Sequence, residues 1–126
     1  MQLPDLQHQA ILLVEDEPVI AMDLVEAFER AGAATAVTSE LQQALVLVED
    51  ESLSAAVLDH VMSDGDTSPL CKRMEERGLP FVMYSGFGKM HGACARGAQV
   101  SKPEDPEVIV AKVAELLRKE RPGAAV

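Results

Sequence analysis

The chain has 126 residues, 48% of them hydrophobic, and a formal net charge of −10 at pH 7. This length suits one domain of roughly 100–200 residues with one packed core. Nucleic acids and anionic membranes are bound by clustered positive charge, and the chain has no stripe of Lys and Arg, so we expect neither as a partner. No apolar run is long enough to cross a membrane, and no signal peptide is visible.

Apolar runs rich in β-forming residues alternate with helical patterns along the chain. We predict strands at 10–15, 34–38, 55–59, 80–84 and 98–101. Helices are predicted to begin near Pro18, Ser39, Ser68, Lys89 and Asp105. This alternation indicates an α/β domain over residues 10–119, in which a parallel sheet is covered on both faces. Residues 1–9 are expected to form a leader, and residues 120–126 a tail.

Local signals define several of the predicted ends. Ser39 and Gln42 have the spacing of a capping box at the start of the second helix. Ser68 followed by Pro69 is typical of a cap and first turn. Glycines crowd residues 86–97, and each glycine weakens a helix by about 1 kcal/mol relative to alanine. The fourth helix is therefore predicted to be short and mobile.

The two cysteines, Cys71 and Cys94, are too few for a disulfide scaffold. Their spacing matches no metal-binding motif, and the three histidines form no pattern with them. We interpret both cysteines as reduced and the protein as cytoplasmic.

Polar residues follow four of the predicted strands directly. Glu15 and Asp16 end the first strand and Asp59 ends the third, while Ser85 and Lys102 follow the last two. Because the carboxyl ends of parallel strands share one edge of the sheet, these side chains are expected to meet there.

The chemistry of this set favours phosphoryl transfer. Three acids provide the oxygen ligands that Mg²⁺ prefers. A carboxylate such as Asp59 is able to act as the nucleophile, and Mg²⁺, Lys102 and Ser85 would neutralise the phosphoryl oxygens. Taken singly, each residue also has an ordinary explanation, as a strand-end cap, a turn cap or a surface charge. Tyr84, next to Ser85, is interpreted as a packing residue.

The order and spacing of Val14-Glu15-Asp16-Glu17-Pro18, Leu58-Asp59, Ser85-Gly86 and Lys102-Pro103 closely resemble the receiver domain of two-component response regulators. The resemblance implies a flavodoxin-like, doubly wound (βα)5 fold with strand order 2-1-3-4-5. It also implies Asp59 as phosphoacceptor, with Mg²⁺ held directly by Asp16 and Asp59, through water by Glu15, and by the backbone carbonyl of Val61. Ser85 and Lys102 would hold the phosphoryl oxygens, and the Lys102-Pro103 peptide is usually cis in this family.

Two further comparisons with family patterns refine this interpretation. Residues 80–88 resemble a group of stand-alone receivers with a Phe-Ala-Thr-Gly motif. The position that usually carries an aromatic switch residue is Gln99 here, which puts the usual aromatic swing in doubt. Val61 and Phe87 are apolar and cannot orient water, so we expect a long-lived aspartyl phosphate.

The sequence therefore predicts a single-domain response regulator rather than an enzyme. A histidine kinase or histidine phosphotransfer protein would donate the phosphoryl group to Asp59, and output would be a changed surface for an unidentified protein target. One alternative is a receiver-like adaptor that works without phosphorylation. The other is a Mg²⁺-dependent phosphohydrolase with Asp59 as nucleophile, although such enzymes typically carry a second acid where this chain has Val61.

Overall fold

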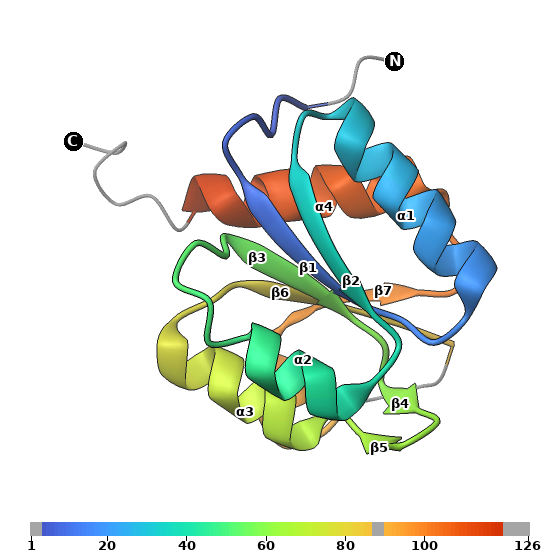
Figure 1. The fold of residues 1–126 in the computed structure, drawn as a ribbon, viewed down its shortest axis with the longest axis vertical. Coiled ribbons are helices and arrows are strands. Elements are labelled where there is room, and N and C mark those ends of the chain that lie inside the picture. The colour runs from blue at the N-terminus through green and yellow to red at the C-terminus, as the bar shows by residue number, and fades with distance from the viewer. Residues whose placement is uncertain (1–3, 87–89, 120–126) are drawn as a thin grey trace.

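The computed structural model describes residues 4–86 and 90–119 and contains a parallel sheet of five strands. The strands are β1 (Ala10–Val14), β2 (Ala34–Thr38), β3 (Ala55–Leu58), β6 (Phe81–Ser85) and β7 (Ala98–Ser101). They lie in the order β2-β1-β3-β6-β7, and every neighbouring pair is parallel (Figure 1). When the five strands of this sheet are numbered 1 to 5 along the chain, their order in the sheet is 2-1-3-4-5, so the predicted fold class is confirmed.

Helices cover both faces of this sheet (Figure 1). They are α1 (Pro18–Arg30), α2 (Leu41–Leu47), α3 (Ser68–Arg77) and α4 (Pro106–Lys119), with a 3-10 helix η1 (Gly92–Arg96) before β7. Among the described residues, no helix is long and apolar enough to cross a membrane.

Alternation along the central strands divides the core into two layers. In β1, Ile11 and Leu13 pack into a cluster with α1 and α4, whereas Leu12 and Val14 pack into a second cluster with α2 and α3. All four side chains are buried. The strands are apolar throughout because both of their faces are covered, as expected for a parallel sheet.

Two short strands follow β3. They are β4 (Val61–Met62) and β5 (Gly65–Asp66), which pair in antiparallel fashion. Gly65 has a φ of +144°, which a residue with a side chain rarely adopts. The glycine therefore permits the tight return of this hairpin.

The predicted capping box at Ser39 is wrong. The N-cap residue of α2 is Glu40, and it makes no side-chain cap. The backbone N–H of Leu41 instead donates to Asp64, at 2.9 Å from Oδ2. Ser68 is likewise the first residue of α3, whose N-cap is Thr67. At α2 a carboxylate 23 positions away, rather than a local motif, accepts the hydrogen bond of an N-terminal N–H.

The prediction of reduced cysteines is also wrong. Cys71 of α3 and Cys94 of η1 form a disulfide, with their Cα atoms 5.1 Å apart. Both residues are buried, because η1 packs against α3. The pairing depends on this tertiary contact, which the sequence spacing does not reveal.

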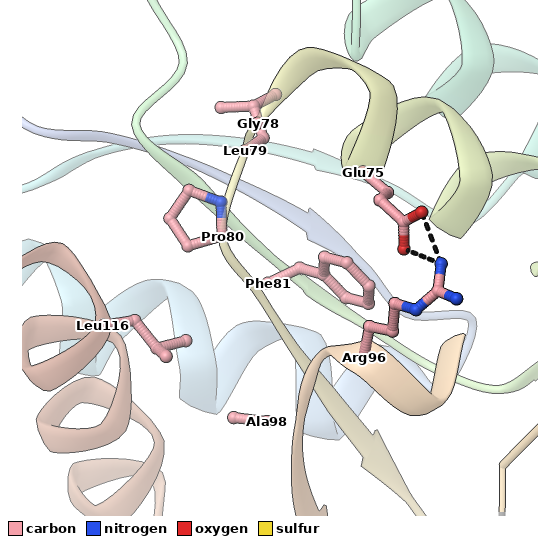
Figure 2. A pocket seen from close by; sticks show the side chains of 8 residues that line it. All are labelled: Glu75, Gly78, Leu79, Pro80, Phe81, Arg96, Ala98 and Leu116. Atoms are coloured by element: carbon pink, nitrogen blue, oxygen red, sulfur yellow. Dashed lines mark hydrogen bonds and ion pairs between the residues drawn. The ribbon is translucent and has the colours of Figure 1, made fainter. Parts of the chain in front are cut away.

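Gly97, between η1 and β7, allows close packing against β6. A Cβ atom at this position would lie 2.4 Å and 2.5 Å from two ring carbons of Phe81 and 2.9 Å from the Phe81 carbonyl oxygen. The Phe81 ring lines a surface pocket beside the Glu75–Arg96 ion pair, as Figure 2 shows. The ring and the backbone of β6 therefore leave no room for a side chain at residue 97.

Substitution of Gly97 tests this packing. We expect Gly97→Ala to lower the free energy of unfolding by about 2 kcal/mol, the usual cost of overfilling a packed site. Gly86→Ala is the control, because its Cβ would meet nothing nearer than Lys102 Cβ at 4.0 Å. Urea unfolding measures both variants. Equal stability of the two would show that Phe81 moves aside without cost.

Candidate functional site

The carboxyl edge of the sheet gathers the predicted site residues. Glu15 follows β1, Asp59 follows β3, Ser85 ends β6, and Lys102 follows β7. Strand-like hydrogen bonds continue past the strand ends and fix these backbones. The Asp59 N–H donates to the Val14 carbonyl at 3.0 Å, and the Lys102 N–H donates to the Ser85 carbonyl at 2.9 Å. Parallel strands thus bring residues far apart in sequence to one edge, as predicted.

Lys102 is the centre of the observed charge cluster. Its Nζ atom lies 3.0 Å from Glu15 Oε1, 3.1 Å from Asp59 Oδ2 and 3.3 Å from Glu17 Oε1. The side chain of Lys102 is only 12% exposed, and those of Glu15 and Asp59 are 3% and 10% exposed. Charges removed from water in this way need partners. The ammonium supplies one partner to both buried carboxylates.

The acidic cluster differs in one member from the predicted set. Carboxylate oxygens of Glu15, Glu17 and Asp59 all lie within 4.8 Å of one another. Asp16 instead accepts hydrogen bonds through Oδ2 from Ser63, at 2.9 Å from the backbone N and 2.7 Å from Oγ. Glu17 was missed by the sequence analysis, and the only signal for it was its place in the acidic triplet before Pro18.

The remaining predicted residues also lie at this edge. Ser85 is 4% exposed. Val61 begins β4, two positions after Asp59, and its backbone pairs with Asp66. Phe87 lies outside the described residues, so the long-lived aspartyl phosphate stays a prediction. The Lys102-Pro103 peptide is cis, as the family resemblance implied.

Gln99 makes contacts that an aromatic side chain cannot make. Its Nε2 donates to the carbonyl oxygens of Cys94 at 3.0 Å and Gly97 at 2.9 Å. The side chain therefore closes over the end of η1. The predicted departure from the aromatic pattern thus has a local structural role.

The donor set fits a magnesium ion. Within residues 4–86 and 90–119, three clustered carboxylates face one ammonium, that of Lys102, so negative charge is in excess among these groups. Mg²⁺ prefers such hard oxygen ligands and usually takes one or two carboxylates together with several waters. Glu15, Glu17 and Asp59 offer oxygens in the observed arrangement, and Asp16 offers one if its carboxylate leaves Ser63.

Burial is the largest influence on the titration of Glu15. Desolvation raises the pKa of this carboxyl group to about 7, with a further contribution from Asp59, while Lys102 acts in the opposite direction. For Lys102, burial disfavours the charged form, but hydrogen bonds to Glu15 and Asp59 outweigh it and raise the pKa of the ammonium. Lys102 is therefore charged at neutral pH, whereas Glu15 is close to its titration midpoint.

The raised pKa of Glu15 predicts how stability depends on pH in the absence of metal. Between about pH 4.5 and 7 the folded chain binds a proton that the unfolded chain has lost, so its stabilising effect disappears as the pH rises through this window. We expect wild type to lose about 2 kcal/mol relative to Glu15→Gln between pH 5 and pH 8.

Urea unfolding of both proteins in EDTA measures this difference. Parallel pH profiles for wild type and Glu15→Gln would contradict the prediction. Saturating Mg²⁺ provides the control, because a bound cation displaces the proton and should flatten the difference.

Known structures share this fold. A CheY-like response regulator receiver domain protein from Methanospirillum hungatei JF-1 superposes with a TM-score of 0.82 and 21% identity, covering 91% of this chain and 98% of that one. A response regulator receiver protein from Sinorhizobium medicae WSM419 gives 0.80 and 20% identity, covering 92% and 99%. The response regulator PhyR from Brucella abortus gives 0.77 and 20% identity, covering 96% of this chain and 52% of its own.

Comparison at the level of sequence gives the family. No curated protein sequence matches the chain significantly. The family model for the response regulator receiver domain matches residues 11–114, which run from β1 into α4 and include every predicted site residue. Together with the doubly wound fold and the acids gathered around Lys102, this match shows that the chain belongs to the response regulator receiver domain family.

Proposed function

We propose that this chain accepts a phosphoryl group on Asp59 from a sensor histidine kinase or a histidine phosphotransfer protein. The observation that carries the proposal is the 3.1 Å contact between Asp59 Oδ2 and Lys102 Nζ within the acidic cluster. Receiver domains are signalling modules of two-component systems, and the residues that the family uses for this chemistry occur here in the expected order.

In the proposed reaction a carboxylate oxygen of Asp59 bonds to phosphorus while the P–N bond of the donor phosphohistidine breaks. The donor imidazole leaves as a nitrogen base that takes up a proton from water. The other Asp59 oxygen is already oriented, since Oδ1 accepts a hydrogen bond from the His60 N–H at 2.8 Å. Phosphoryl transfer depends mainly on such positioning and on neutralised charge.

Lys102 and Ser85 are proposed to bind the transferred group. Lys102 would exchange its contact with the Asp59 carboxylate for one with a phosphoryl oxygen, and Ser85 would donate its hydroxyl from the end of β6. When bound, Mg²⁺ would supply the remaining positive charge at the oxygens of Glu15, Asp59, Asp16 or Glu17, and Val61. Glu17 is included because it lies in the observed cluster. The other ligand and phosphoryl roles follow the family pattern residue by residue.

The proposed output is a changed surface for another protein rather than catalysis. Phosphorylation converts a carboxylate at the sheet edge into a larger anion, and Lys102 and Ser85 would shift toward it. Both lie next to β7, which would carry the change. The segment 86–97 would carry it as well, although residues 87–89 lie outside the described part of the chain. We propose a cytoplasmic location, as expected for a partner of histidine kinases, with no nucleic-acid or membrane partner.

Intact-mass spectrometry tests the proposal with the purified chain and acetyl phosphate. We expect a mass increase of one phosphoryl group per chain that requires Mg²⁺ and disappears in EDTA. A phosphorylated histidine phosphotransfer protein should serve as a second donor. Absence of uptake from every donor would favour the adaptor alternative, and continuous release of phosphate from an ester substrate would favour the phosphohydrolase.

A further inference from the structure

The Tyr84 side chain contacts Lys102 and the turn that follows it. It precedes Ser85 in β6, and it is 5% exposed within the cluster that packs against α1 and α4. Its ring and its hydroxyl both meet the segment that follows β7. The ring contacts the Lys102 ammonium, and the hydroxyl contacts the Glu104 backbone.

The first contact is between the Tyr84 ring and the Lys102 ammonium. Lys102 Nζ lies 5.5 Å from the ring centroid, within the range of a cation–π interaction. The ring therefore favours one placement of the ammonium, on the side of the sheet edge where the carboxylates of Glu15 and Asp59 lie 3.0 Å and 3.1 Å from Nζ. Holding a flexible lysine side chain in one placement costs rotamer freedom, and the contact with the ring offsets part of that cost.

The second contact fixes the backbone two residues after Lys102. The Tyr84 hydroxyl accepts a hydrogen bond from the Glu104 N–H at 2.8 Å and donates one to the Glu104 carbonyl at 3.0 Å. Both bonds are part-buried, and a hydrogen bond is stronger where water is partly excluded. Together with the Lys102 N–H bond to Ser85, they tie the turn at residues 102–104 to β6 at the lysine and two residues after it.

We infer that Tyr84 is a positioning residue for Lys102, setting where the ammonium meets a phosphoryl group on Asp59. The inference rests on the proposed function, because it assigns Lys102 to the phosphoryl group. Its consequence is that the hydroxyl and the ring make separable contributions. Tyr84→Phe removes the hydrogen bonds to Glu104 and keeps the ring, whereas Tyr84→Leu removes both.

Phosphoryl uptake from acetyl phosphate with Mg²⁺ provides the main readout. We expect the uptake rate to fall about 5-fold in Tyr84→Phe, in which both hydrogen bonds to Glu104 are lost, and about 30-fold in Tyr84→Leu, in which the ring contact is lost as well. Phe28→Leu is the control, since Phe28 is fully buried in the same cluster on α1. This variant should lose stability and keep the wild-type uptake rate.

A double-mutant cycle shows whether Tyr84 acts through Lys102. In a Lys102→Met background we expect Tyr84→Leu to change the uptake rate by less than about 2-fold, because the group that it positions is gone. An undiminished effect in that background would overturn the inference. NMR adds a test that needs no phosphoryl chemistry: ring-current shifts of the Lys102 ε protons should persist in Tyr84→Phe and disappear in Tyr84→Leu.

The outcomes separate this inference from the proposed function. A wild-type chain that takes up no phosphoryl group overturns both. If the wild type is phosphorylated and Tyr84→Leu takes up phosphoryl groups equally fast, only the positioning role is overturned. The positioning role is supported if the uptake rate falls from wild type to Tyr84→Phe to Tyr84→Leu and if Tyr84→Leu has no such effect in the Lys102→Met background.

Discussion

Replacing Asp59 with asparagine is expected to lower phosphoryl uptake by at least about 1,000-fold, or roughly 4 kcal/mol of transition-state stabilisation. Asparagine keeps the shape of the side chain and is able to accept the hydrogen bond from the His60 N–H. It lacks the anionic oxygen that attacks phosphorus, and the other acids of the cluster are not expected to replace it. The measurement is the initial rate of uptake from acetyl phosphate with saturating Mg²⁺.

Asp50→Asn is the matched control for this substitution. Asp50 is exposed and lies between α2 and β3, at the opposite end of the sheet from the cluster. Among the described interactions, its carboxylate accepts hydrogen bonds only from Ser52. The variant removes one negative charge, as Asp59→Asn does, and should take up phosphoryl groups at the wild-type rate. Comparable uptake by Asp59→Asn would place the acceptor elsewhere, and comparable loss in Asp50→Asn would indicate an effect of net charge.

Reduction of the Cys71–Cys94 disulfide is expected to lower the free energy of unfolding by about 3 kcal/mol. The bond closes a loop between residues 23 positions apart, and a cross-link of this span restricts the unfolded chain by about that amount. Urea unfolding with and without a phosphine reductant measures the change. The folded structure should persist after reduction, because both cysteines lie within an apolar cluster to which α2, α3 and β3 also contribute buried side chains.

A double variant, Cys71→Ala with Cys94→Ala, is the control for effects of the reductant on other groups. Its stability should be unaffected by reductant and close to that of the reduced wild type. Alkylation of the unreduced, denatured wild type should detect no free thiol. An unchanged unfolding midpoint on reduction, or two alkylated cysteines in the oxidised protein, would contradict the pairing.

The sequence predicted the frame of the site because that frame depends on strands. Apolar runs marked the five strands to within one residue at each end. Parallel pairing then required Glu15, Asp59, Ser85 and Lys102 to share an edge, whatever the details of the loops. The contact between Lys102 and Asp59, over 43 positions of sequence, follows from this arrangement.

Features that depend on side-chain direction or on tertiary packing were not predictable in the same way. Asp16 and Glu17 are neighbours of Glu15, and only the local backbone decides that Glu17 points toward Lys102 while Asp16 points toward Ser63. The cap on α2 comes from Asp64, which lies in the turn of the β4–β5 hairpin, and no local motif indicated that hairpin. The disulfide likewise required the contact between α3 and η1.

Tyr84 shows how a correct interpretation from sequence can be incomplete. Its position in a buried strand predicted packing, and the residue is indeed buried. The cation–π contact and the two hydrogen bonds to Glu104 involve a turn some 20 positions further along the chain. A single sequence carries no sign of that pairing.

Chemical mapping of the modified residue tests the central claim most directly. The chain is phosphorylated with acetyl phosphate and Mg²⁺ and then treated with borohydride, which reduces an aspartyl phosphate to homoserine. Peptide mass spectrometry locates the product. We predict homoserine at position 59 and nowhere else among the acids of the cluster. Reduction at residue 15, 16 or 17, or a phosphate that resists borohydride because it is carried by a hydroxyl or an imidazole, would contradict the account.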